Sequence, residues 1–435
     1  MTIKAIINAV MYEKWCRLLT TLMRLVVGGV FIFSGFTKAI DPWGTCYKIT
    51  DYLTAMGLVE WTGTVLFIAV ALAAMEFMLG VAIALGAYRR SAPVVALLLM
   101  LVMTPLTLWI AATGAVPDCG CFGDALHLSN WATFFKNLLL LLGIIYLLLF
   151  NKSVPSIYGP AVQWVVMTLS FGMVMAIAYY GYFYQPLIDY RPYPVGTRLA
   201  STVEDTGGGE EDFVFVYERD GQQQEFSIDS LPDEEQGWEY VTRYHARRPR
   251  GKVIVQDGSH NNGIAILDEN GDNITADVLP ANGNTMLLLF PDLSQVGVVS
   301  SFNLNELTDA ALVSDINVMG LTPATAHEIE QWKDNSMASY PIYNIDDSEL
   351  KMVARGNPAV VFLHDGVITW KRTLASLDDV EQPIELAALA DDYDSDSIMT
   401  NLMLAYLAAM LVLLALNRTH IVFKHLFFKK KKSTD

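Results

Sequence analysis

Six long apolar runs alternate with polar segments along this chain. A helix needs about 20 residues to cross the hydrocarbon core of a bilayer, and each run is close to that length. We therefore predict six membrane-spanning helices, at Leu18–Ile40, Thr62–Ala87, Pro93–Thr113, Trp131–Phe150, Val162–Phe183 and Ile398–Leu416.

Lys and Arg are shared unevenly between the segments that join these runs. Basic residues precede the first run, separate the second from the third and the fourth from the fifth, and follow the sixth. If every run spans, they all fall on one side, which the positive-inside rule assigns to the cytoplasm. We predict a protein of the bacterial inner membrane, with both termini cytoplasmic. Residues 41–61, residues 116–130 and the long segment between the fifth and sixth runs would then be periplasmic.

Composition separates the two parts of the molecule further. Of 435 residues, 53% are hydrophobic and 17% are charged, and the formal net charge is −17. The acidic residues gather in residues 189–397. This acidity argues against nucleic acid as a partner, because phosphate binding needs clustered Lys and Arg. It fits a solvated domain outside the bilayer, with the lipid bilayer as the partner of the remaining chain.

The segment between the fifth and sixth runs alternates strand and helix patterns. A hairpin is expected first, and the later elements follow a β-α-β and then a β-β order, which is typical of an α/β domain. The expected strands are Phe213–Tyr217, Glu225–Ile228, Ile264–Leu267, Thr285–Phe290, Ala359–Leu363 and Val367–Arg372, with helices at Ser300–Asp315 and Ala324–Asn335.

Two stretches of the membrane part resemble known families. The segment from Arg24 to Lys38, followed by Asp41-Pro-Trp-Gly44, resembles the first helix of the DoxX family. The stretch Asp118-Cys-Gly-Cys-Phe-Gly-Asp124 is similar to the related methylamine-utilisation MauE family. The resemblance covers about residues 18–150 and implies a four-helix membrane bundle.

The cysteines are the candidate catalytic residues. Cys119 and Cys121 flank Gly120, whose freedom of backbone angles allows a sharp turn that brings the two sulfurs together. Three interpretations stay open: a pair that cycles between dithiol and disulfide, a structural closure of the loop, or two thiolates that hold a metal. The MauE resemblance implies the first, alongside a thioredoxin-like partner. A quinone-linked relay generally needs a second pair, and we interpret the lone Cys46 as a small filler residue.

Polar side chains inside the predicted spans are the next candidates. A carboxyl at Glu76, in the second run, is costly unless it is neutral or paired, so it is a functional candidate. It could instead be a protonated acid bonding to another helix, or a structural partner of Arg24 or Lys38. Glu76 and Trp109 are the predicted cofactor-binding residues, in a pocket for a quinone or a lipid head group. A local salt bridge is expected between Lys38 and Asp41.

The segment Arg355-Gly-Asn-Pro-Ala-Val-Val-Phe-Leu-His-Asp-Gly366 is similar to the thioredoxin stretch in which a proline, often cis, precedes a strand and a hairpin glycine. Pro358 holds that place. Where thioredoxins carry Cys-x-x-Cys, this chain reads Pro291-Asp-Leu-Ser-Gln-Val-Gly297, and residues 191–395 contain no cysteine. This domain therefore cannot exchange disulfides itself. We expect it to dock a partner or to cover the mouth of the bundle. Its histidines show no metal-binding spacing.

These observations predict a membrane all-α protein with a DoxX/MauE-like four-helix bundle, two further spans and an α/β thioredoxin-like extramembrane domain. The expected units are residues 1–152, the bundle; 153–190, the fifth span and exit; 191–250, a hairpin-rich extension; 251–395, the degenerate thioredoxin-like domain; and 396–435, the sixth span and basic tail. The predicted function is a membrane redox accessory that sets the thiol–disulfide state of periplasmic proteins through Cys119-Gly120-Cys121. Its partner would be a periplasmic thioredoxin-like or client protein. The alternative is a non-catalytic scaffold whose thioredoxin-like domain binds envelope partners.

Overall fold

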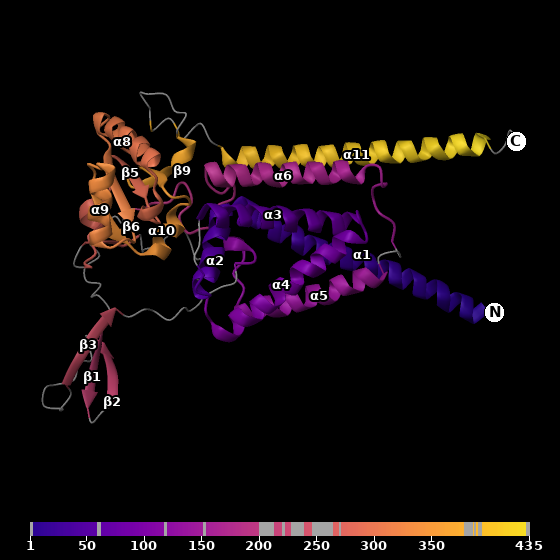
Figure 1. Ribbon diagram of the computed structural model, residues 1–435, viewed down its shortest axis with the longest axis horizontal. Helices are drawn as coiled ribbons and strands as arrows, with labels where there is room; N and C mark the ends of the chain where they lie inside the picture. The colour runs from indigo at the N-terminus through magenta and orange to yellow at the C-terminus, as the bar shows by residue number, and fades with distance from the viewer. Residues whose placement is uncertain are drawn as a thin grey trace.

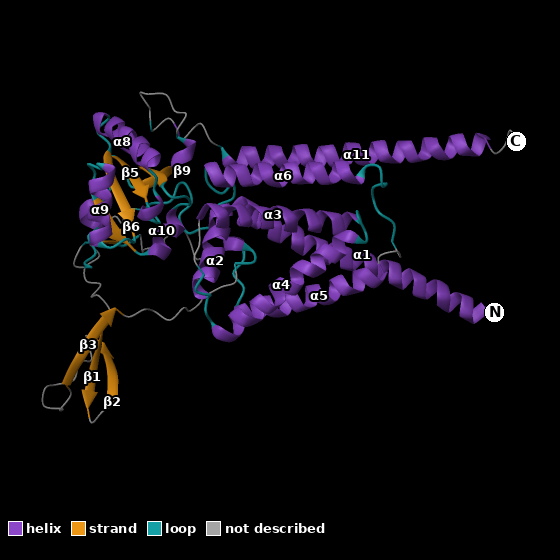
Figure 2. Ribbon diagram, viewed as in Figure 1, coloured by secondary structure: helices purple, strands orange, loops and turns teal. Residues whose placement is uncertain are grey.

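The computed structural model describes most of the chain. The described residues are 3–58, 62–116, 120–150, 154–199, 213–219, 222–227, 239–245, 264–268, 271–377, 386, 389 and 394–431. Helices and strands occupy separate parts of the molecule (Figure 2).

Six described helices are long and apolar enough to cross a membrane. They agree with the six predicted spans: the first helix begins well before Leu18 and the last continues well beyond Leu416, and the other ends lie within a few residues of those expected. The helices are α1 (Ile3–Ile40), α3 (Thr62–Leu85), α4 (Ser91–Thr113), α5 (Asn130–Phe150), α6 (Gln163–Phe183) and α11 (Ser395–Lys431).

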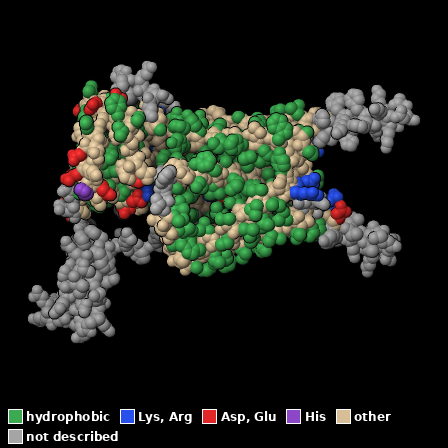
Figure 3. Space-filling view, viewed as in Figure 1, with side chains coloured by type: hydrophobic (Ala, Val, Ile, Leu, Met, Phe, Trp, Pro, Cys, Tyr) green, Lys and Arg blue, Asp and Glu red, His purple; other side chains and the backbone are tan. Residues whose placement is uncertain are grey.

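Both chain ends lie at one end of these helices, and the six-stranded sheet lies at the other, which we call the domain end (Figure 1). Hydrophobic side chains cover the visible face of the helical part, and blue Lys and Arg side chains gather near the end that carries the termini (Figure 3). This charge distribution agrees with the basis of the predicted orientation. Which side is cytoplasmic stays a prediction.

The pair α1 and α3 forms the centre of the membrane part. One buried apolar cluster joins this pair to α4 and α5, and another joins it to α6 and α11. The two helices approach closely because glycines face the neighbouring backbone: a Cβ at Gly35 would lie 2.3 Å from the backbone nitrogen of Phe77, and one at Gly80 would lie 2.4 Å from that of Ile32. Small residues allow such close helix packing in membranes.

The helix α2 (Pro42–Ala55) crosses the domain end of the membrane helices (Figure 1). Asp41 caps it by accepting a 2.8 Å hydrogen bond from the backbone nitrogen of Gly44. Pro42 occupies the first helical turn, where a missing N–H costs nothing. No helix is predicted from the sequence in residues 41–61, so α2 is an addition to the predicted elements.

The sheet domain, residues 264–377, is built on a six-stranded sheet with the order β4-β7-β6-β5-β8-β9. Strands β5, β6 and β7 are parallel, whereas β8 pairs antiparallel with β5 and β9 with β8. The strands are β4 (Ile266–Leu267), β5 (Asn284–Leu289), β6 (Asn317–Thr322), β7 (Ile342–Ile345), β8 (Ala359–His364) and β9 (Val367–Thr373). The helices are α7 (Thr275–Val278), α8 (Val298–Val313), α9 (Ala326–Ser336) and α10 (Asp347–Val353). The predicted strands and helices of this region are confirmed, and β6, β7, α7 and α10 are additions.

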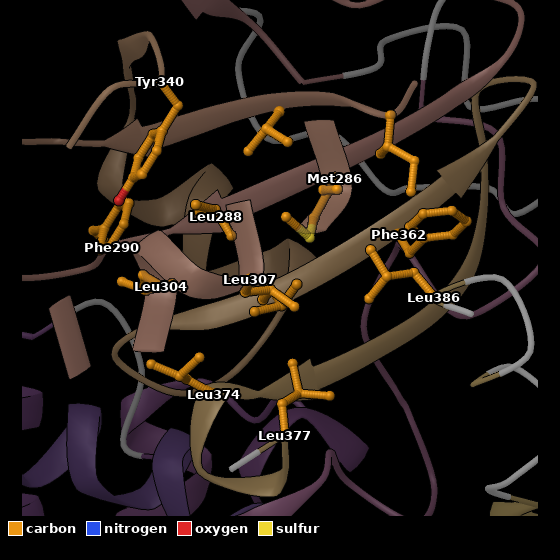
Figure 4. Close-up of a cluster of buried hydrophobic side chains, with 14 of the residues drawn as sticks. Met286, Leu288, Phe290, Leu304, Leu307, Tyr340, Phe362, Leu374, Leu377 and Leu386 are labelled. Carbon is orange, nitrogen blue, oxygen red and sulfur yellow. The ribbon is translucent and has the colours of Figure 1, made fainter. Parts of the chain in front are cut away.

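Strand β5 is apolar from Met286 onwards because both faces of the sheet are covered there. Met286, Leu288 and Phe290 point into a core that includes residues of α8, whereas the alternate residues point into a second core on the opposite face. Figure 4 shows the first core, with Leu304 and Leu307 of α8 against the sheet. Leu304 is completely buried.

A second, three-stranded antiparallel sheet has the order β2-β1-β3. It consists of β1 (Phe213–Arg219), β2 (Gln222–Ser227) and β3 (Glu239–His245). The predicted hairpin is confirmed by the antiparallel pairing of β1 with β2. Strand β1 also pairs with β3, so these strands form a sheet separate from the six-stranded one.

Candidate functional site

The loop after α4 lies against the domain end of α1. Cys119 lies outside the described residues, whereas Gly120 to Ala125 are described and end in a 3-10 turn, η1 (Gly123–Ala125). Gly120 has a φ of +56°, as expected for the predicted sharp turn. The carbonyl oxygen of Cys121 accepts hydrogen bonds of 2.8 Å from both Lys38 Nζ and Ser34 Oγ. The main chain of the cysteine loop is therefore held by α1.

An ion pair is buried beneath this loop. Lys38 Nζ lies 2.8 Å from Glu76 Oε2, and the two side chains are only 7% and 9% exposed. Lys38 also donates to Ser34 Oγ, at 2.7 Å, one turn earlier on α1. Several partners were considered for Glu76, and in the structure it pairs with Lys38.

The expected salt bridge between Lys38 and Asp41 is wrong. Side chains of an α-helix tilt towards its N-terminus, so Lys38 points back into the helices. Asp41 lies beyond the end of α1 and pairs instead with Arg355 of the sheet domain. Arg24, the other expected partner of Glu76, donates to the carbonyl oxygens of Val154 and Pro155.

A cavity of about 500 Å³ lies next to the ion pair and is lined by residues of α1 to α5 and of the cysteine loop. Most of its wall is apolar, and its polar residues include Lys38, Glu76, Asn137 and Cys121. Asn137 Nδ2 donates a 3.2 Å hydrogen bond to Thr107 Oγ1, which also lines it.

The cavity opens on the lipid-facing surface. Among its wall residues, Phe67 is 73% exposed, Ile68 46% and Met56 45%. A bilayer would contact the exposed face of α3, which carries Phe67 and Ile68. A membrane-soluble molecule could therefore reach the buried polar groups sideways, without crossing water.

The sheet domain contacts the same end of the membrane helices through Arg355. Its Nε lies 2.8 Å from Asp41 Oδ2, and its Nη2 lies 2.5 Å from Asp124 Oδ2 in the cysteine loop. Burial disfavours the charged guanidinium, but the two carboxylates more than offset this and raise the pKa of Arg355. The Arg355 side chain is 7% exposed, so this is a buried ionic contact between the two parts of the molecule.

Comparison with known families follows the same division. The family model described as Methylamine utilisation protein MauE matches residues 16–150, which contain the cysteine loop and every residue that lines the cavity. This part of the chain is MauE-like. A second model, Domain of unknown function (DUF8463), matches residues 211–246, which include the three-stranded sheet. No curated protein and no solved structure was found to match the chain.

Two of the predicted site residues, Cys121 and Glu76, line the cavity. Trp109 is not among its lining residues, but it belongs to a small apolar cluster that also contains Ile110, Val116 and Cys121. Cys46 is 1% exposed and packs against Val65 and Ala69. Its burial suits the filler role expected of it.

The sheet domain carries a groove of about 790 Å³ between η4 (Leu293–Gln295), α8 and α9. It lies directly after β5, where the sequence reads Pro291-Asp-Leu-Ser-Gln-Val-Gly297. Asp292 and Asn357 join this segment to the stretch before Pro358, because Asn357 Nδ2 donates to the Asp292 carbonyl oxygen at 2.7 Å. The peptide bond between Asn357 and Pro358 is cis.

The segment that leaves α6 is anchored to the sheet domain by a buried cluster of charges. Asp189 Oδ1 lies 2.7 Å from Arg191 Nε, and its Oδ2 lies 2.6 Å from Lys371 Nζ. Burial disfavours ionisation of Asp189, but Arg191 and Lys371 outweigh it and hold its pKa at about 2.

Within the described part of the chain, no group of three or more His, Cys, Asp or Glu could hold a metal ion.

Sequence reasoning missed Arg355, Ser34 and Asp124 as parts of this site. Arg355 and Asp41 are 314 residues apart, and no local pattern signals their contact. Ser34 read as one of the small residues that pack helices in membranes. Its spacing offered a signal, because residues four apart on a helix lie on one face, and Ser34 is four residues before Lys38.

Proposed function

We propose that this protein is a redox component of the bacterial inner membrane, associated with methylamine utilisation as the MauE family name indicates. It would set the thiol–disulfide state of periplasmic proteins through Cys119 and Cys121. The observation that carries the proposal is the position of Cys121 in the wall of a lipid-accessible cavity, above a buried Lys38–Glu76 pair. An apolar cavity with a few convergent polar groups is the usual form of a small-molecule site.

The proposed reaction has two steps that balance. A client dithiol reduces the Cys119–Cys121 disulfide by exchange, which leaves the client with a disulfide and the loop with two thiols. The loop is then reoxidised: its two thiols lose two electrons and two protons, an S–S bond forms, and a membrane quinone becomes a quinol. The amide of Asn137 would supply a hydrogen-bond donor for one quinone carbonyl oxygen, whereas the three N–H groups of Lys38 already bond Ser34 Oγ, Glu76 Oε2 and the Cys121 carbonyl oxygen.

We further propose that the sheet domain is thioredoxin-like. Its order β7-β6-β5-β8-β9, with β8 and β9 antiparallel to β5, supports this, as does the contact of Asn357 with the segment after β5. The exchange chemistry of that fold is excluded because residues 191–395 contain no cysteine. The domain would then serve docking, with a separate thioredoxin-like protein or the client as its partner.

Thiol trapping tests the redox proposal. The full chain in lipid nanodiscs is reduced, freed of reductant and incubated with or without a short-chain ubiquinone. Free thiols are then alkylated and counted by mass. Quinone is expected to remove two alkylation sites from the wild type and none from Cys121→Ser, while Cys46→Ser behaves like the wild type. The proposal fails if Cys119 and Cys121 stay reduced at every quinone concentration.

The groove on the sheet domain favours a second candidate, a non-catalytic scaffold. Phe302 and Met337, which line the groove, are 61% and 84% exposed, and large exposed apolar groups often mark interaction sites. Cross-linking the full chain in native membranes tests it. Phe302→Arg should abolish a specific envelope adduct that the exposed control Leu312→Arg retains. Identical adducts in both variants would rule out docking at this groove.

A further inference from the structure

The sheet domain contributes one buried side chain to the cysteine loop. Arg355 bridges two carboxylates. One is Asp41, which caps the start of α2, and the other is Asp124 of η1, at the end of the cysteine loop. Asp124 follows Cys121 by only three residues. One guanidinium therefore fixes the start of α2 and the end of the cysteine loop relative to each other. Its planar fork of donors suits two acceptors at once.

The carboxylate of Asp41 has two tasks. Its Oδ1 caps α2 by accepting from the Gly44 nitrogen at 2.8 Å, while its Oδ2 accepts from Arg355. Lys48, about two turns after Asp41, lies against Gly120, where an added Cβ would come within 2.8 Å of the Lys48 Cγ. A movement of Arg355 would therefore reach the cysteine loop by two routes, through Asp124 and through α2.

Arg355 is itself held rigidly on the domain side. The side chain of Gln185, in the exit segment after α6, bonds both the backbone N–H and the backbone carbonyl of Arg355. Gln185 Nε2 donates to the Arg355 carbonyl oxygen at 2.7 Å, and its Oε1 accepts from the Arg355 nitrogen at 3.0 Å. The guanidinium also donates to the Lys351 carbonyl oxygen. These bonds hold the backbone and the guanidinium of Arg355 in place. The guanidinium can therefore fix the positions of the two carboxylates that it binds.

We infer that Arg355 is a positioning residue that the sheet domain supplies to the membrane site. It holds the Gly120–Asp124 segment in one geometry and so controls access to Cys121. It acts through the two carboxylates with which it forms ion pairs, Asp124 and Asp41. This inference concerns the loop of the proposed function, but it does not require that loop to be redox-active.

Maleimide labelling of a single cysteine tests this role. The full chain, purified in detergent, carries Ser at positions 16, 46 and 119, so that Cys121 is the only thiol and no disulfide can form. Arg355→Gln is expected to speed labelling of Cys121 by about tenfold or more, because loss of the guanidinium leaves two partly buried carboxylates uncompensated. The control Lys333→Gln removes one positive charge from α9 of the same domain and should leave the rate unchanged.

Two further variants separate positioning from packing. Arg355→Lys should keep part of the protection, whereas Arg355→Met, which fills similar space without charge, should not. Equal protection by both would assign Arg355 a packing role and overturn the inference, as would an unchanged rate in Arg355→Gln. If the Arg355 variants do not fold, Asp124→Asn on the membrane side provides the test. Faster labelling of Cys121 is expected, and an unchanged labelling rate would overturn the inference. Because thiol trapping measures redox chemistry and this labelling measures access, either proposal can fail alone.

Discussion

The buried ion pair between Lys38 and Glu76 gives the sharpest quantitative prediction. Replacing one partner leaves the other as an uncompensated buried charge, which typically costs about 3–5 kcal/mol. Lys38→Met also removes the donor to Ser34 Oγ and one of the two donors to the Cys121 carbonyl oxygen. We expect Lys38→Met and Glu76→Met each to lower the free energy of unfolding by about 3 kcal/mol or more.

The double variant should be far less damaging than the sum of the two changes. Two methionines fill the space without leaving a charge, and replacing a buried pair by apolar residues is often close to neutral. The Cys121 carbonyl oxygen remains satisfied, because Ser34 Oγ still donates to it at 2.8 Å. We expect Lys38→Met/Glu76→Met to cost about 1 kcal/mol, which leaves a coupling energy of several kcal/mol in the cycle.

Equilibrium unfolding of the full chain in mixed detergent micelles measures all three variants. The exposed pair of Lys351 and Asp347, with side chains 26% and 50% exposed, supplies the control. Breaking it with Lys351→Met should cost under about 1 kcal/mol, because water screens exposed charges. If the two buried substitutions simply add in the double variant, the side chains do not interact and the reasoning about this pair is refuted.

Further predictions concern packing and charge elsewhere in the molecule. Gly35→Ala should destabilise the membrane part by about 2 kcal/mol, because the new Cβ meets backbone atoms of α3. Unfolding in detergent measures this, and the control Gly29→Ala, whose Cβ would have no atom within 4 Å, should have no such effect. Leu304→Ala should cost the sheet domain about 3 kcal/mol by tryptophan fluorescence, against under about 0.5 kcal/mol for the 56% exposed Leu312→Ala. Ionised Asp189 should contribute about 2 kcal/mol that is complete above about pH 4 and is lost as the pH falls towards 2. Asp189→Asn should flatten that part of the stability profile, and equal slopes in both proteins would contradict this role.

The sequence identified the membrane helices well because bilayer thickness imposes a length on every span. It identified β5 for a similar reason, since a strand buried on both faces is rich in apolar residues. Both signals are local. The helix α2 also had a local signal, Asp41 as an N-cap followed by Pro42, and a search for caps would have found it.

The composition of the cavity wall could be predicted only in part. Glu76 stood out because a carboxyl in a span is rare. Trp109 is not among the residues that line the cavity, although Leu106, three residues earlier, is, so a cofactor role for Trp109 stays a prediction. The contacts of Arg355 depend on docking between distant segments, and docking leaves no periodic pattern in a sequence.

The cavity itself bears on the choice between a redox loop and a merely structural one. The cavity of about 500 Å³ has exposed wall residues such as Phe67, so membrane molecules can fill it. A lipid acyl chain would satisfy the apolar wall but offers no acceptor to Asn137 Nδ2. A ligand with a polar ring and an isoprenoid tail would satisfy both parts of the wall. Its ring would share the cavity with Cys121, which favours the proposed redox loop over a merely structural one.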